Sequence, residues 1–148
     1  MKRLLISFGC LTSLSAGMAY ATWLFLGPPD RSVVCAQAEL PEYFVCLKTV
    51  ERWPQDEVLW VDARPREDWE KDGREGSILV NDQEDWFDLE AGFMQMIGVQ
   101  TKILVYCNRS GCGSSKYVAD QLRSRHAETF GFEVFVLEGG AKALSARD

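Results

Sequence analysis

Two residues in the stretch "KILVYCNRSGCGSS", residues 102–115, have the type and spacing for covalent chemistry: Cys107 and Cys112. A cysteine thiolate is a nucleophile, and two cysteines in one short loop can also exchange with a disulfide. A third interpretation is a plain turn, in which each cysteine packs as a small apolar residue. The residues around the pair and the elements that position it decide between these interpretations.

The loop that follows Cys107, "NRSGCG", is suited to holding an anion. It contains two glycines and two short polar side chains, so several backbone N–H groups can point inward, next to the start of a helix. Because a thiolate is an anion, we expect a lowered pKa for Cys107. Arg109 and Lys116 add positive charge to this segment, and Ser114 or Ser115 is expected to cap the helix.

From residue 44 onward, apolar runs that indicate strands alternate with helical segments. Strands that are apolar throughout and separated by helices are typical of a parallel sheet covered on both faces, in which ligands bind at the carboxyl ends of the strands. Three predicted strands end in polar or glycine-rich residues: "VDAR", "VYCNRSGCG" and "VLEGG". The predicted strands are 44–46, 57–63, 77–81, 102–107 and 133–139, and the predicted helices are 47–53, 65–73, 84–98, 114–125 and 141–147.

The N-terminal part has a different composition. Residues 4–27 contain no charge, and 24 residues in a helix span about 36 Å, enough to cross a hydrocarbon core of roughly 30 Å. Lys2 and Arg3 predict a single-pass signal-anchor helix with a cytoplasmic N-terminus and the domain on the periplasmic or other extracytoplasmic side. A linker, 28–44, and one domain, 45–148, follow.

The alternative for this segment is a signal peptide, since Ala19-Tyr20-Ala21 has the small-x-small form of a cleavage site. Against cleavage, the apolar run continues for several residues beyond Ala21. Lipidation of Cys10 is disfavoured, because the residues before it do not follow the lipoprotein pattern.

Charge and composition exclude several classes of function. Residues 28–148 contain 14 basic and 22 acidic residues, a formal net charge of −8, which argues against a nucleic-acid partner. His126 is the one histidine, so a multi-histidine metal site is excluded, and "NDQEDWFDLE" lacks the spaced ligands and central glycine of a calcium loop. We expect neither a metal nor a cofactor.

The order of the motifs resembles a rhodanese-like domain. The similarity rests on "VLWVDARPREDWEKDGREGSILVN", "ILVYCNRSGCGSSKYVADQLR" and "VFVLEGG", in this order, and covers roughly residues 45–144. The resemblance implies a three-layer α/β/α fold with a five-stranded parallel sheet. It also implies that Cys107 accepts a sulfane sulfur from a small anion or a persulfide and passes it to a thiol acceptor.

The resemblance further implies the roles of the neighbouring residues. Asp62 and Arg64 match the Asp-x-Arg of the family and are expected to be mainly structural, Asp62 at the strand end and Arg64 paired with an acidic group. The predicted substrate-binding loop consists of Asn108, Arg109, Ser110, Gly111, Cys112, Gly113 and Ser114.

The loop departs from the common family pattern, Cys-x-x-Gly-x-Arg-Ser. It is one residue longer, and Gly113 occupies the place of the arginine before Ser114. A phosphatase needs that guanidinium to hold an oxyanion, so phosphatase activity is disfavoured. Cys112 is an addition that can attack a persulfide or sulfenate on Cys107. A thiol-redox protein and a non-catalytic interaction module therefore stay open beside the sulfurtransferase, and Cys35 and Cys46 form a further possible pair.

Overall fold

A computed structural model describes residues 35–98, 100–108 and 112–145 of the chain. The predicted membrane helix, 4–27, lies outside these ranges, as do Arg109, Ser110 and Gly111 of the loop. Among the described residues, no helix combines the length and the apolar character needed to cross a bilayer.

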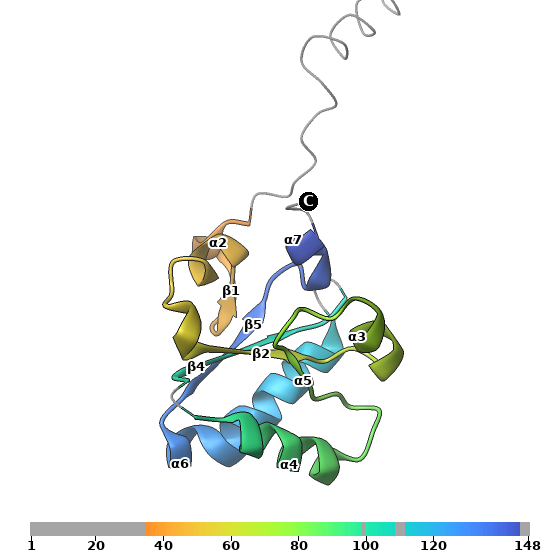
Figure 1. Cartoon of the computed structure of the whole chain (residues 1–148). Helices are drawn as coiled ribbons and strands as arrows, with labels where there is room; N and C mark the ends of the chain where they lie inside the picture. The colour runs from red at the N-terminus through yellow and green to blue at the C-terminus, as the bar shows by residue number, and fades with distance from the viewer. Residues whose placement is uncertain (1–34, 99, 109–111, 146–148) are drawn as a thin grey trace, which may run out of the picture. The chain divides into compact units, whose positions relative to one another are not determined.

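The centre of the domain is a parallel sheet of five strands in the order β1-β5-β4-β2-β3 (Figure 1). All four strand pairs are parallel, which confirms the predicted sheet. The central strand β4 pairs with β2 and β5 along its length, and the edge strands are two residues long. The strands are β1 Phe44–Val45, β2 Val58–Asp62, β3 Ile78–Leu79, β4 Lys102–Tyr106 and β5 Glu133–Leu137.

Helices connect the strands, as the alternation of the sequence predicts. The helices are α2 Leu47–Val50, α3 Arg66–Asp72, α4 Trp86–Met96, α5 Gly113–Leu122, α6 Glu128–Phe130 and α7 Ala141–Ser145, with 3₁₀ turns at Gln37–Glu39 and Gln55–Glu57. A π-helical segment, Arg123–Ala127, joins α5 to α6, so the helical region continues beyond the predicted end at residue 125. It stops at Gly131, whose φ of 73° is left-handed and favours glycine.

Alternate residues of the central strands enter two separate cores, one on each face of the sheet. Ile103 and Val105 of β4 pack with Val118 of α5, whereas Leu104 and Tyr106 belong to the other core. The second core also takes in residues of α2 and α7. Because both faces are covered, β2 is buried throughout, and its sequence lacks the polar alternation of a half-exposed strand.

Helix α4 begins where its sequence predicts a favourable start. The Asp85 side chain accepts hydrogen bonds from the backbone N–H groups of Phe87 and Asp88, satisfying two of the free donors at the helix start. Phe93 is fully buried in the core. Met96, in contrast, is 52% exposed, and Ile97, just beyond the helix, packs on the core.

The segment directly before β1 is tied to the domain by a disulfide and by side-chain hydrogen bonds. Cys35 is bonded to Cys46, with the two Cα atoms 5.7 Å apart. The Gln37 side chain donates to the carbonyl of Phe44 and accepts from the backbone N–H of Cys46. The last part of the predicted linker is therefore held against the first strand and the start of α2.

Candidate functional site

Cys107 lies at the carboxyl end of the central strand, immediately after β4. The alternation along β4 directs its side chain to the same core as Ile103 and Val105, beneath the start of α5. Only 2% of Cys107 is exposed. A nucleophile in this position is almost fully shielded from solvent.

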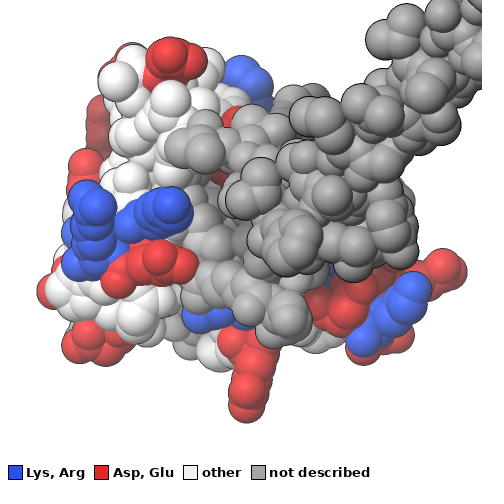
Figure 2. Space-filling model, turned by 90° about the horizontal axis from the view of Figure 1, so that it is seen from above, with Lys and Arg blue, Asp and Glu red and all other residues white. Residues whose placement is uncertain are grey.

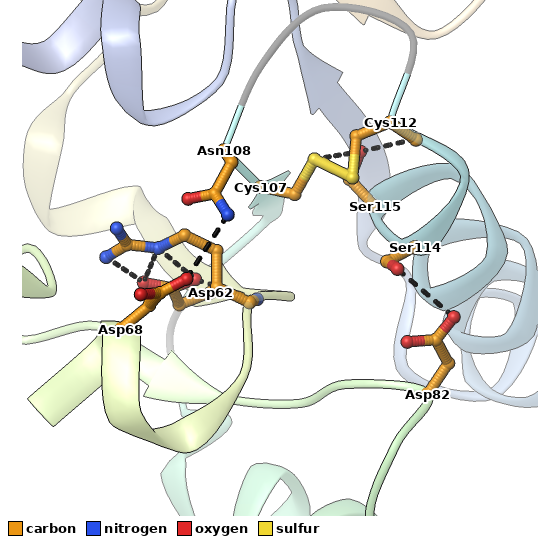
Figure 3. Close-up of a disulfide and its surroundings, with 9 residues drawn as sticks. Asp62, Asp68, Asp82, Cys107, Asn108, Cys112, Ser114 and Ser115 are labelled. Atoms are coloured by element: carbon orange, nitrogen blue, oxygen red, sulfur yellow. Dashed lines mark hydrogen bonds and ion pairs between the residues drawn. A yellow bond between two sulfur atoms is a disulfide. The ribbon is translucent and has the colours of Figure 1, made fainter.

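Cys107 is bonded to Cys112 in the structure, across the loop (Figure 3). The Cα atoms are 6.4 Å apart, within the range that disulfides span. Cys112 is partly buried and is the N-cap residue of α5. The expected caps, Ser114 and Ser115, are therefore wrong: the helix begins at Gly113, one residue earlier than predicted.

Ser115 contacts the sulfur of Cys107 from the first turn of α5. Its Oγ lies 3.6 Å from Cys107 Sγ and 3.2 Å from the carbonyl oxygen of Cys112, to which it donates. The side chain is buried, with 4% exposed. A buried hydroxyl in this position can donate a hydrogen bond to a negatively charged sulfur on Cys107.

Two carboxylates hold the ends of the loop. Asn108 donates from its side-chain nitrogen to Asp68 of α3 at 3.2 Å, and Ser114 Oγ donates to Asp82 at 3.1 Å (Figure 3). The expected contribution of Lys116 differs, because Lys116 is 62% exposed and forms an ion pair with Asp120 on its own helix. Both of these side-chain hydrogen bonds from the loop thus end on the carboxylates of acidic residues.

Asp62 and Arg64 form a buried ion pair at the neighbouring strand end. Arg64 Nη2 lies 2.8 Å from Asp62, Arg64 Nη1 lies 2.6 Å from Asp72, and the backbone N–H of Arg64 donates to Asp62. Burial by itself lowers the pKa of the Arg64 guanidinium, but hydrogen bonds to both carboxylates outweigh burial and hold this pKa above its ordinary value. Arg64 thus pairs with two acidic groups, and its mainly structural role stays a prediction.

A hollow of about 550 Å³ lies next to Asn108. Its lining includes Arg64, Tyr106, Asn108 and Lys142, and Cys107 does not line it. Burial raises the pKa of Tyr106 to about 12, so its hydroxyl stays a neutral donor at physiological pH. This hollow borders the site without giving direct access to the Cys107 sulfur.

Acidic and basic side chains lie next to each other on the part of the surface that Figure 2 shows in colour. Electrostatic effects at the site therefore depend on individual contacts more than on a field of one sign. Over the described ranges, no three His, Cys, Asp or Glu side chains are grouped to hold a metal ion.

The sheet and its cysteine define the class of protein: a parallel α/β domain with a thiol site after its central strand. The sequence matches the family described as Rhodanese-like domain over residues 47–147. The chain belongs to the rhodanese-like domain family. No curated protein matches the chain.

Two solved structures share the fold. The N-terminal domain of a protein from Clostridium difficile 630, named for ATP/GTP binding, is 20% identical with a TM-score of 0.50, covering 70% of this chain and 97% of its own. BH2092 from Bacillus halodurans is 18% identical with a TM-score of 0.51, covering 71% of this chain and 72% of its own. At these identities the likeness concerns the fold alone.

Sequence reasoning missed three residues that contact the site. Asp68 and Asp82 lie far from Cys107 along the chain, and nothing in their local pattern marks them as partners of the loop. Ser115 carried a signal, because it opens the predicted helix. Its contact with the sulfur depends on how α5 packs on the end of β4, which the local sequence does not show.

Proposed function

We propose that this domain is a sulfurtransferase in which Cys107 carries a sulfane sulfur. The observation that carries the proposal is the Cys107 sulfur at the carboxyl end of β4, in contact with the buried Ser115 hydroxyl, in a chain of the rhodanese-like family. The Cys107 thiolate attacks the outer sulfur of a donor, the sulfur–sulfur bond of the donor breaks, and a thiolate leaves. A thiol acceptor then takes the outer sulfur from the Cys107 persulfide.

The donor that fits the loop best is an organic persulfide. A small dianion such as thiosulfate needs positively charged partners. The described side chains at the two ends of the loop, Asn108 and Ser114, instead donate hydrogen bonds to the carboxylates of Asp68 and Asp82. Arg64 is occupied by two carboxylates, and Gly113 replaces the arginine of the common family loop. The outer sulfur of a persulfide carries less negative charge than thiosulfate, so the carboxylates of Asp68 and Asp82 repel it less.

We further propose that residues 4–27 anchor the domain to a membrane, with the domain on the extracytoplasmic side. The uncharged run behind Lys2 and Arg3 supports this topology. The Cys35–Cys46 disulfide supports an oxidising compartment, where such bonds persist. Labelling of Cys35 and Cys46 in intact cells, before and after reduction, tests the compartment: a bond found reduced inside the cell would contradict it.

A thiol-redox protein is the second candidate, and the Cys107–Cys112 bond favours it. One experiment separates the two functions. The reduced full chain is incubated with a persulfide donor, and transfer of sulfur to cyanide or to a thiol is followed. A sulfurtransferase loses transfer in Cys107→Ser. A purely redox protein shows no sulfur transfer and instead reduces or oxidises a dithiol substrate, with both Cys107 and Cys112 required. Absence of both activities would indicate an interaction module.

A further inference from the structure

The two cysteines of the loop are placed for reaction with each other without a change of the backbone. Cys112 is bonded to Cys107 in the structure, so its sulfur reaches the inner sulfur, Sγ, of any persulfide formed on Cys107. Ser115 contacts both the Cys107 sulfur and the Cys112 carbonyl oxygen, and these contacts hold the end of β4 close to the start of α5. The nearest thiol to a loaded Cys107 is therefore in the same chain.

The two cysteines differ in their exposure to solvent. Cys107 is 2% exposed and part of the core, whereas Cys112 is partly buried and heads α5. An external thiol reaches the Cys112 side of a disulfide more easily than the Cys107 side. The carbonyl oxygen of Cys107 also accepts a hydrogen bond from the backbone N–H of Ala141 at 2.6 Å, which ties the buried partner to the start of α7.

We propose that Cys112 resolves the Cys107 persulfide and releases its outer sulfur as hydrogen sulfide. The Cys112 thiolate attacks Sγ of Cys107, the bond between Sγ and the outer sulfur breaks, and hydrosulfide leaves with the electron pair. The Cys107–Cys112 disulfide forms, so the two cysteine sulfurs are oxidised while the sulfane sulfur is reduced to sulfide. This inference rests on the proposed sulfurtransferase function, because it requires that Cys107 is first loaded.

The proposal assigns the domain a place in a reaction sequence. A reaction that produces persulfides must supply the donor, and a thiol or dithiol reductant must reopen the disulfide after each cycle. The reductant attacks the Sγ of Cys112, the more accessible sulfur, and leaves Cys107 as a free thiolate ready for the next donor. In the absence of a reductant, the domain releases one sulfide and stops.

A single-turnover experiment on the full chain tests this. The chain is reduced without oxygen, freed of reductant, mixed briefly with glutathione persulfide and desalted, and the sulfide then released is measured over time. Remaining thiols are alkylated, and peptide mapping locates each disulfide and persulfide. Cys112→Ser is the matched variant, and Cys107→Ser reports background release.

We expect the wild-type chain to release one sulfide per loaded chain and to form the Cys107–Cys112 disulfide. Cys112→Ser is expected to hold the sulfur on Cys107 and to release sulfide at least about tenfold more slowly, because it loses the advantage of intramolecular attack. Equal release by both chains, or movement of the sulfur to Cys112 without sulfide, would overturn the inference while leaving sulfur loading intact. Failure of both chains to load sulfur would instead contradict the proposed function and this inference with it.

Discussion

The hydroxyl of Ser115 lies 3.6 Å from the sulfur of Cys107, inside the core and beneath the first turn of α5. This contact joins the central strand to the helix that follows it, and both residues are almost inaccessible to solvent. A charged sulfur in such a place needs a hydrogen-bond donor, since burial without one is costly. In the proposed mechanism, Ser115 supplies that donor for the Cys107 thiolate.

Replacing Ser115 with alanine is expected to slow the loading of sulfur onto Cys107. One hydrogen bond contributes about 0.5–1.5 kcal/mol, so the loading rate should fall by about two- to tenfold. The rate of persulfide formation on Cys107, followed by intact mass in chains that also carry Cys112→Ser, measures this. Ser124→Ala is the control, because Ser124 is exposed and bonds to Gln121 on its own helical segment. Equal rates in both variants would show that the contact with the sulfur has no role in loading.

Removing the charge of Asp82 is expected to increase the rate at which thiosulfate loads sulfur onto Cys107. Asp82 accepts from Ser114 at the end of the loop, and a unit charge about 4 Å away contributes roughly 1 kcal/mol in a watery setting. Asp82→Asn should therefore raise loading from thiosulfate about fivefold and change loading from a persulfide much less. Asp85→Asn is the matched control, since it removes the same charge at the cap of α4. An unchanged preference between the two donors would argue against electrostatic selection.

Arg64 should be far more important for stability than Arg66. Removing Arg64 leaves the fully buried Asp62 without its main partner, at a cost of about 3–5 kcal/mol in the free energy of unfolding. Arg66 forms an exposed pair with Glu84, so Arg66→Ala should cost less than about 1 kcal/mol. Urea unfolding of Arg64→Ala and Arg66→Ala measures both values. Similar losses in the two variants would contradict a structural role for the buried pair.

Tyr106 should make the domain sensitive to alkaline pH. Burial raises its pKa from 10.0 to about 12, so folding favours the neutral phenol. The stability that this shift contributes is fully present below pH 10 and is lost as the pH rises through about 12. The wild-type chain should therefore lose stability more steeply between pH 10 and 12 than Tyr106→Phe. If the free energy of unfolding falls with the same slope against pH in both chains between pH 10 and 12, the raised pKa of Tyr106 would be disproved.

The strands and their order of appearance could be predicted from the sequence, because strands buried on both faces consist of apolar residues throughout. Leu104 and Tyr106 face one core while Ile103 and Val105 face the other, and no polar residue interrupts β4. The strand order β1-β5-β4-β2-β3 was not predicted, since no local pattern encodes which strands become neighbours.

The details of the site were harder to predict, because they depend on contacts between distant segments. The start of α5 was placed one residue too late, since serine is a good N-cap in isolation whereas the structure has Cys112 at that position. Asp68 and Asp82 reach the loop only because α3 and the segment after β3 pack beside it. The role of Cys107 was suggested by its position after a strand, and its chemistry stays a prediction.

The mass of the reduced Cys112→Ser chain after incubation with a persulfide donor tests the central claim most directly. The account predicts an increase by the mass of one sulfur atom, located on Cys107 by peptide mapping and lost on addition of cyanide. The same treatment should leave the doubly substituted Cys107→Ser, Cys112→Ser chain without a sulfur that cyanide removes from this loop. An unchanged mass, or a sulfur found only on cysteines outside the loop, would contradict the account.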